Sequence, residues 1–153
     1  MSDECIPDEA GALAWKLRKQ VLFAYPKHVL KPEDLLDFIE LPSFTRRWDH
    51  DLKLDAENDL CALQLGIMAN PKASPVIKGT GGLRKMRFAP ERWKSGKSGA
   101  ARVLYVYFEE FGIVLLCLVY GKGEKENISL AVRKYVKKLI GEVANELERK
   151  KRL

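Results

Sequence analysis

Cysteine and histidine are scarce in this chain of 153 residues, which holds three cysteines and two histidines. Cys5, Cys61 and Cys117 lie far apart, with no CxxC pair and no cysteine–histidine cluster that could bind a structural zinc ion. Cys61 and Cys117 stand in apolar contexts typical of reduced core residues. His28 and His50 have no neighbours that support a proton-transfer pair, so we interpret both as surface residues.

Long apolar runs and nucleotide-binding motifs are missing too. The longest apolar run, residues 113–119, has the length of a strand and is too short to cross a bilayer, and the acidic N-terminus does not resemble a signal peptide. Gly96-Lys97-Ser98 lacks the earlier glycine of a P-loop, because Glu91 stands at that position. No acidic cluster fits a two-metal nuclease. The sequence therefore predicts a cytoplasmic protein without membrane contact, metal or other cofactor.

Positive charge, by contrast, is concentrated in one segment of a chain whose net charge is +6. Residues 1–77 carry 9 Lys and Arg against 13 Asp and Glu, a net of −4. Residues 78–102 carry 8 against 1, a net of +7, and residues 103–153 carry 10 against 7, a net of +3. Such a segment is typical of proteins that bind a polyanion, although a solvated basic loop has the same composition.

Hydrophobic periodicity predicts an α+β protein. Residues 1–34 are expected to form an extension with one helix at 8–25, and residues 35–153 the main domain. Within that domain the spacing of apolar residues predicts helices at 43–50, 55–70 and 129–150, and strands at 83–88, 101–108 and 113–120. Residues 35–41 fit either a helix start or a short strand. Because the strand at 113–120 is apolar on both faces, we expect it at the centre of the sheet.

Cations alternate with apolar residues on the strand that follows the glycine-rich segment. Side chains on a strand point to opposite faces in turn. Lys85 and Arg87 therefore share one face, whereas Met86 and Phe88 share the other and can enter a core. Arg102 opens the strand that we expect to pair with this one, which can bring it near the two cations.

Cations arranged in this way suit the cleavage of RNA. When a 2′-OH attacks the adjacent phosphate, negative charge builds on the non-bridging oxygens, and fixed cations stabilise it. The candidate catalytic residues are Lys85, Arg87 and Arg102, and the candidate RNA-binding residues are Arg84, Lys94 and Lys97. From composition alone, binding of phosphate without catalysis is the favoured interpretation, because phosphate contacts are far commoner than catalysis. The alternatives to an enzyme are a module that binds RNA or the ribosome and a domain whose basic face meets an acidic protein. The aromatic side chains of Tyr105, Tyr107 and Phe108 fit base stacking or, more commonly, core packing.

Four segments carry a family resemblance. They are Asn70-Pro71 after a helix, residues 76–87 with the run Gly-Thr-Gly-Gly-Leu-Arg-Lys, residues 99–105 with Arg102, and residues 116–125 with Tyr-Gly-Lys. As a set they resemble the RelE/HigB superfamily of toxins from type II toxin–antitoxin systems, in particular its HigB-like branch. The resemblance covers about residues 36–146.

This resemblance implies a fold, an activity and partners. The implied RelE-like fold has a short first strand at 36–41, two helices, an antiparallel three-stranded meander and a C-terminal helix, here with an extra N-terminal helix. The implied activity is ribosome-dependent cleavage of mRNA without a metal ion, with ribosomal RNA and a cognate HigA-like antitoxin as further partners. By position, Lys85 and Arg87 match cations of the family's second strand, Arg102 opens its third, and Lys122 matches an RNA-contacting lysine after its last strand.

Two positions depart from the RelE branch. Gly123 replaces an arginine, and Ser129 stands in the place of a tyrosine that is implicated in proton transfer or base stacking. HigB-like members commonly lack that pair. The general base is therefore unassigned, with Tyr120 and Lys85 as candidate substitutes.

Overall fold

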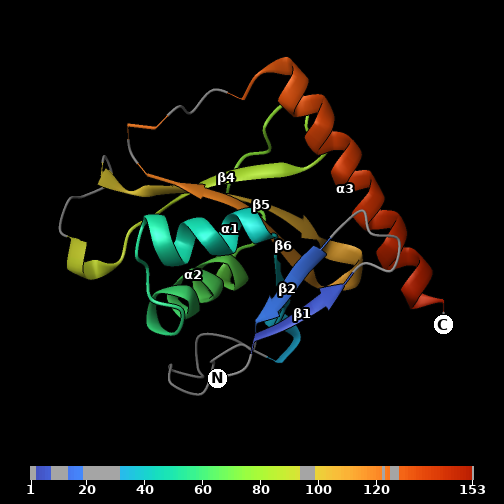
Figure 1. The fold of residues 1–153 in the computed structure, drawn as a ribbon. Coiled ribbons are helices and arrows are strands. Elements are labelled where there is room, and N and C mark those ends of the chain that lie inside the picture. Colours follow the sequence, from blue (N-terminus) through green and yellow to red (C-terminus); the bar gives the residue numbers. More distant parts are fainter. Residues whose placement is uncertain are drawn as a thin grey trace.

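The protein is described by a computed structural model, shown in Figure 1, for residues 3–7, 14–18, 32–93, 99–121, 123–124 and 128–152. For the first two of these segments only the backbone is described. No helix within the described residues is both long enough and apolar enough to cross a membrane.

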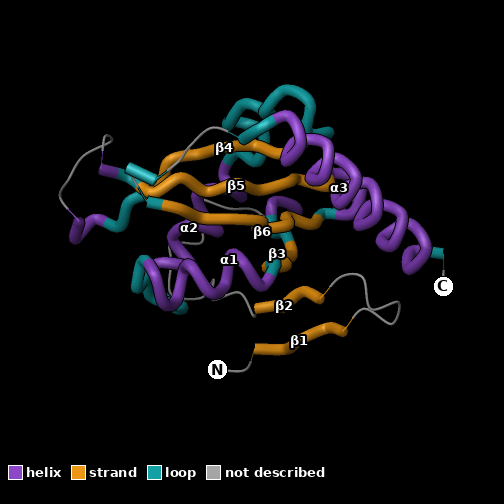
Figure 2. Tube along the Cα trace, turned by 45° about the horizontal axis from the view of Figure 1, so that its top comes forward, coloured by secondary structure: helices purple, strands orange, loops and turns teal. Residues whose placement is uncertain are grey.

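The described strands form one mixed sheet in the order β1-β2-β3-β6-β5-β4 (Figure 2). Their bounds are β1 Asp3–Pro7, β2 Ala14–Arg18, β3 Asp37–Glu40, β4 Leu83–Phe88, β5 Ala101–Phe108 and β6 Ile113–Tyr120. β3 pairs with β6 in parallel, and all other neighbours are antiparallel. The three strands of the predicted meander are confirmed, and residues 37–40 form the short strand that the resemblance implied.

Within the part of the chain that the structure describes, three helices flank this sheet. Their bounds are α1 Pro42–Arg46, which continues into a π-helical turn at Arg47–Asp51, α2 Asn58–Ala69 and α3 Leu130–Lys151. Short 3-10 turns occur at Pro32–Asp34, Glu91–Trp93 and Glu109–Phe111. Each of these helices lies where hydrophobic periodicity predicted one, and the α+β class is confirmed.

The predicted N-terminal helix at 8–25 is wrong for residues 14–18, which form β2. β2 pairs with β1 and also with β3, in register with Ile39 and Glu40. The reason is tertiary, because an unpaired edge of β3 would expose a row of backbone N–H and C=O groups that a neighbouring strand satisfies. The rest of 8–25 lies outside the described residues.

The sheet lies between the layer of α1 and α2 and the helix α3 (Figures 1 and 2). A hydrophobic core lies on each side of it. α1 and α2 cover one face, and their core includes Phe38, Trp48, Leu63, Tyr105 and Leu116. α3 covers part of the other face, and its core includes Leu83, Leu104, Leu115, Ile140 and Val143. β6 contributes to both cores, which confirms its predicted central place.

The aromatic side chains of β5 belong to the cores. Tyr105 is 1% exposed and its hydroxyl donates to the carbonyl oxygen of Pro71 at 2.8 Å. Phe108 is buried, and the half-buried Tyr107 packs against the first core. Core packing, the commoner interpretation of these residues, is confirmed for all three.

Candidate functional site

Three neighbouring strands bring the predicted catalytic arginines into one row. Arg87 of β4 lies opposite Arg102 of β5, and Arg102 lies opposite Tyr120 of β6. Directly opposite residues of antiparallel strands share a face. That face is the one on which α3 packs, because Tyr120 belongs to the second core. Lys85 shares it by alternation, and we call Lys85, Arg87, Arg102 and Tyr120 the cationic row.

Exposure changes along the cationic row. Arg87 is exposed, Lys85 and Arg102 are half-buried, and Tyr120 is buried. The guanidinium of Arg102 donates to the carbonyl oxygen of Ala100 at 2.5 Å, whereas the side chain of Arg87 makes no hydrogen bond or ion pair with any described residue. A phosphate on this face would therefore contact Arg102, whose guanidinium is held in place, and Arg87, whose guanidinium can move toward it.

The helix α3 leaves this part of the sheet open. It packs near the start of β4, on Leu83, and on Leu104 and Leu115 of the next two strands. Arg87 lies at the other end of β4. Figure 1 shows α3 crossing the sheet at the end opposite the turn that follows β4. Arg87 consequently lies on the same face as α3 and beside it, at an exposed position that a chain of RNA can reach, while Tyr120 is buried at the other end of the row.

The glycine-rich segment before β4, residues 79–82, packs against α3. The φ angle of Gly81 is +80°, and a Cβ atom there would lie 3.1 Å from Cγ of Lys137 on α3. The buried Thr80 donates to the carbonyl oxygen of Ile77 at 2.6 Å and accepts from the backbone N–H of Leu83 at 3.0 Å. These contacts explain why small and turn-forming residues occupy this segment, without a role in phosphate binding.

Arg84, which was predicted from the sequence to bind RNA, does not join the cationic row. Arg84 lies on the opposite face of β4, where its Nη1 donates to the carbonyl oxygens of Lys72 at 3.2 Å and Ser74 at 2.7 Å. Its guanidinium thus holds the loop after α2 against the sheet. Lys94, Lys97 and Lys122 lie outside the described residues.

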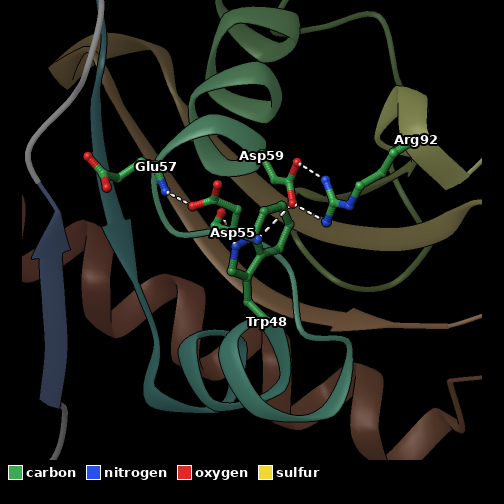
Figure 3. A network of polar contacts seen from close by, with 5 residues as sticks. All are labelled: Trp48, Asp55, Glu57, Asp59 and Arg92. Carbon is green, nitrogen blue, oxygen red and sulfur yellow. Dashed lines mark hydrogen bonds and ion pairs between the residues drawn. The ribbon is translucent and has the colours of Figure 1, made fainter.

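Arg92, another cation of the basic segment, forms an ion pair with the buried Asp59 at the start of α2 (Figure 3). Nη1 of Arg92 donates to Oδ1 of Asp59 and Nη2 donates to Oδ2, each at 2.6 Å. Burial acts to raise the pKa of Asp59, but hydrogen bonds from Arg92 and from the backbone N–H of Asp55 outweigh it and lower that pKa. The Nε1 of Trp48 donates to the carbonyl oxygen of Asp55, and Asp55 accepts from the N–H of Glu57. The turn after β4 is therefore fixed to α2.

A second polar cluster holds the end of β6, next to Tyr120. Nε of Arg47 donates to the carbonyl oxygen of Val119 at 2.8 Å, and the same guanidinium forms an ion pair with Glu124. Glu124 also accepts from the N–H of Gly121 at 2.7 Å, which is the main reason why its pKa is lowered. These contacts of Arg47 and Glu124 were not predicted from the sequence. Their only sequence signal is a glutamate three residues after a glycine.

The two departures from the RelE branch have structural roles here. Ser129 caps α3, since its hydroxyl accepts from the N–H of Val132 at 3.2 Å. Gly123 has a φ of +90°, a conformation that favours glycine over arginine.

No family model matches the chain. Within the described residues, no three His, Cys, Asp or Glu side chains gather as metal ligands would.

Proposed function

We propose that this protein is an endoribonuclease toxin of a type II toxin–antitoxin system, which cuts mRNA on the ribosome and so inhibits translation. The observation that carries the proposal is the register that places the exposed Arg87 of β4 opposite the half-buried Arg102 of β5, on the face of the sheet that also carries α3. The family resemblance supplies the ribosome and the cognate HigA-like antitoxin as partners.

The reaction uses a nucleophile that RNA itself carries. The 2′-OH attacks the adjacent phosphorus, loses its proton, and displaces the 5′-oxygen of the next nucleotide, which gains a proton. The products are a 2′,3′-cyclic phosphate and a 5′-hydroxyl end. DNA lacks the 2′-OH and is not a substrate.

The cationic row supplies charge stabilisation in this scheme. Arg87 and Arg102 approach the scissile phosphate from adjacent strands and stabilise the charge on its non-bridging oxygens. Tyr120 and Lys85 are the candidate groups for the proton transfers. The Tyr120 hydroxyl is buried in the second core, whereas Lys85 is half-buried, so we assign the transfer at the RNA to Lys85. Arg84, Lys94, Lys97 and Lys122 stay predictions as contacts to message or ribosomal RNA.

A primer-extension experiment on a translated message tests the proposal. It compares the wild type with Arg87→Ala, Arg102→Ala and the control Arg152→Ala, which removes an exposed arginine at the far end of α3. We expect new 5′ ends that require ribosomes, that are lost in the first two variants and that persist in the control.

Two results contradict the proposal. Cleavage by Arg87→Ala and Arg102→Ala at the wild-type rate would remove the cationic row from the mechanism. Ribosome binding by the wild type without any new 5′ end would instead indicate a non-catalytic RNA- or ribosome-binding module.

A further inference from the structure

Large apolar side chains are exposed on the first turns of α3. Leu130 is 70% exposed, Val132 47% and Tyr135 66%, although the helix buries a full stripe against the sheet. An exposed tyrosine presents a rigid, flat and partly apolar surface to a partner. The flank of α3 on which Tyr135 lies decides which part of the sheet that surface is next to.

The contacts of α3 fix the direction of each flank. Val136, Ile140 and Val143 face the sheet. Arg133 and Lys137 form the flank toward the glycine-rich segment, since Nη1 of Arg133 donates to the carbonyl oxygen of Lys78 at 2.8 Å and Lys137 lies against Gly81. Residues three and four apart share a flank of a helix.

Tyr135 lies on the opposite flank, because it is about half a turn from both Arg133 and Lys137 around the helix. Val132 and Leu139, three residues before it and four after it, share that flank. The glycine-rich segment leads directly into Leu83, and β4 runs from there to Arg87. The flank turned away from that segment therefore faces the part of the sheet that carries Arg87 and Arg102.

We propose that Tyr135 is a base-stacking residue, which holds a base of single-stranded RNA beside the phosphate bound at the cationic row. This inference rests on the proposed function. It adds a contact to a base, because the cations of the row contact only phosphates. Cations that follow the backbone, together with an aromatic ring that stacks a base, form a recurring way of binding single strands. A tyrosine suits this role because it supplies a large contact area at little cost in conformational entropy. Val132, one turn before it, extends the apolar surface.

Binding of a twelve-nucleotide 2′-fluoro oligouridine, measured by fluorescence anisotropy on the full chain, tests the inference without cleavage. Tyr135→Ala is expected to bind roughly 10- to 100-fold more weakly, as the loss of one stacked base predicts. Tyr135→Phe and Tyr135→Trp should stay close to the wild type. The matched control is Leu130→Ala, which removes an equally exposed side chain from another flank of the same helix.

The dependence on salt separates stacking from charge. The slope of log affinity against log salt should be the same for Tyr135→Ala and the wild type, because no phosphate contact is lost, whereas Arg87→Ala should lower it. On an oligomer in which all bases are replaced by abasic sites, wild type and Tyr135→Ala should bind alike. Melting temperatures verify that each variant is folded.

Each contrary result overturns a different statement. Wild-type affinity in Tyr135→Ala, together with cleavage by the wild type, overturns the stacking role and leaves the proposed function standing. If Tyr135→Ala loses ribosome binding but keeps its affinity for oligouridine, the stacking role is also overturned, since the ring would then contact protein or folded RNA. Failure of the wild type both to bind the oligouridine at low salt and to cut a translated message in the presence of ribosomes overturns both.

Discussion

Replacing Arg87 by glutamine should stabilise the fold while it weakens RNA binding. Arg87 and Arg102 are directly opposite on adjacent strands and share a face. Like charges in that relation repel each other and destabilise a sheet. A site that holds two arginines together for a phosphate therefore carries a cost when the phosphate is absent.

The expected size follows from Coulomb's law. Guanidinium groups about 7 Å apart repel by about 0.6–1.2 kcal/mol at an effective dielectric constant of about 40–80. Ionic screening leaves about 0.5–1 kcal/mol at low salt and below about 0.3 kcal/mol at half-molar salt. For a chain of this size, 1 kcal/mol corresponds to about 2–4 °C in melting temperature.

Urea unfolding at low and high salt measures the effect, and Arg84→Gln on the same strand is the matched control. Arg84→Gln removes two hydrogen bonds to backbone carbonyls. It should therefore lower the free energy of unfolding by about 1–2 kcal/mol at both salt concentrations. A double-mutant cycle of Arg87→Gln and Arg102→Gln isolates the repulsion from the bond of Arg102 to Ala100.

The reasoning is refuted if Arg87→Gln lowers the free energy of unfolding at low salt, or if the cycle gives no coupling. Either result would mean that the two guanidinium groups do not face a common space. Unchanged RNA affinity in Arg87→Gln would separate the repulsion from function.

Three further predictions concern other parts of the molecule. Leu63→Ala, in the first core, should lower the free energy of unfolding by about 2–5 kcal/mol in urea. The pKa of Glu124 is lowered in the folded state, so its ionised carboxylate stabilises the fold above the ordinary pKa of glutamate. That stabilisation is lost as pH falls through the lower pKa of the folded state. Glu124→Gln should therefore have a lower melting temperature than the wild type at neutral pH, and the difference should close below about pH 4. Burial raises the pKa of the Cys117 thiol to about 12, so mass spectrometry should find Cys117 unlabelled after iodoacetamide treatment of the native protein at pH 8 and labelled after unfolding.

The meander and its cations could be predicted because the signals are local. Alternation placed Lys85 and Arg87 on one face and Met86 and Phe88 on the other, and the structure bears out that division. The nearness of Arg102 followed from its place at the start of the next strand. Each of these inferences needs only neighbouring residues and one turn between strands.

Features that join distant segments were missed. β2 is a strand because it pairs with the edge of β3. The sequence of residues 8–25 contains no local signal for that pairing. Arg92 and Asp59 are 33 residues apart, so a count of charges could not show that one balances the other. The two functions of neighbouring arginines, Arg84 on carbonyls and Arg87 on the open face, differ only in which side of β4 they occupy.

The parallel pairing of β3 with β6 has a consequence for synthesis. Asp37 pairs with Ile113, which leaves the ribosome 76 residues later. At about 5–20 residues per second, β3 waits roughly 4–15 s for its partner. The row itself is complete only when Tyr120 has been added. A nascent chain that stops before Tyr120 holds the arginines without the strand that aligns them, so the proposed activity begins only after β6 has been added.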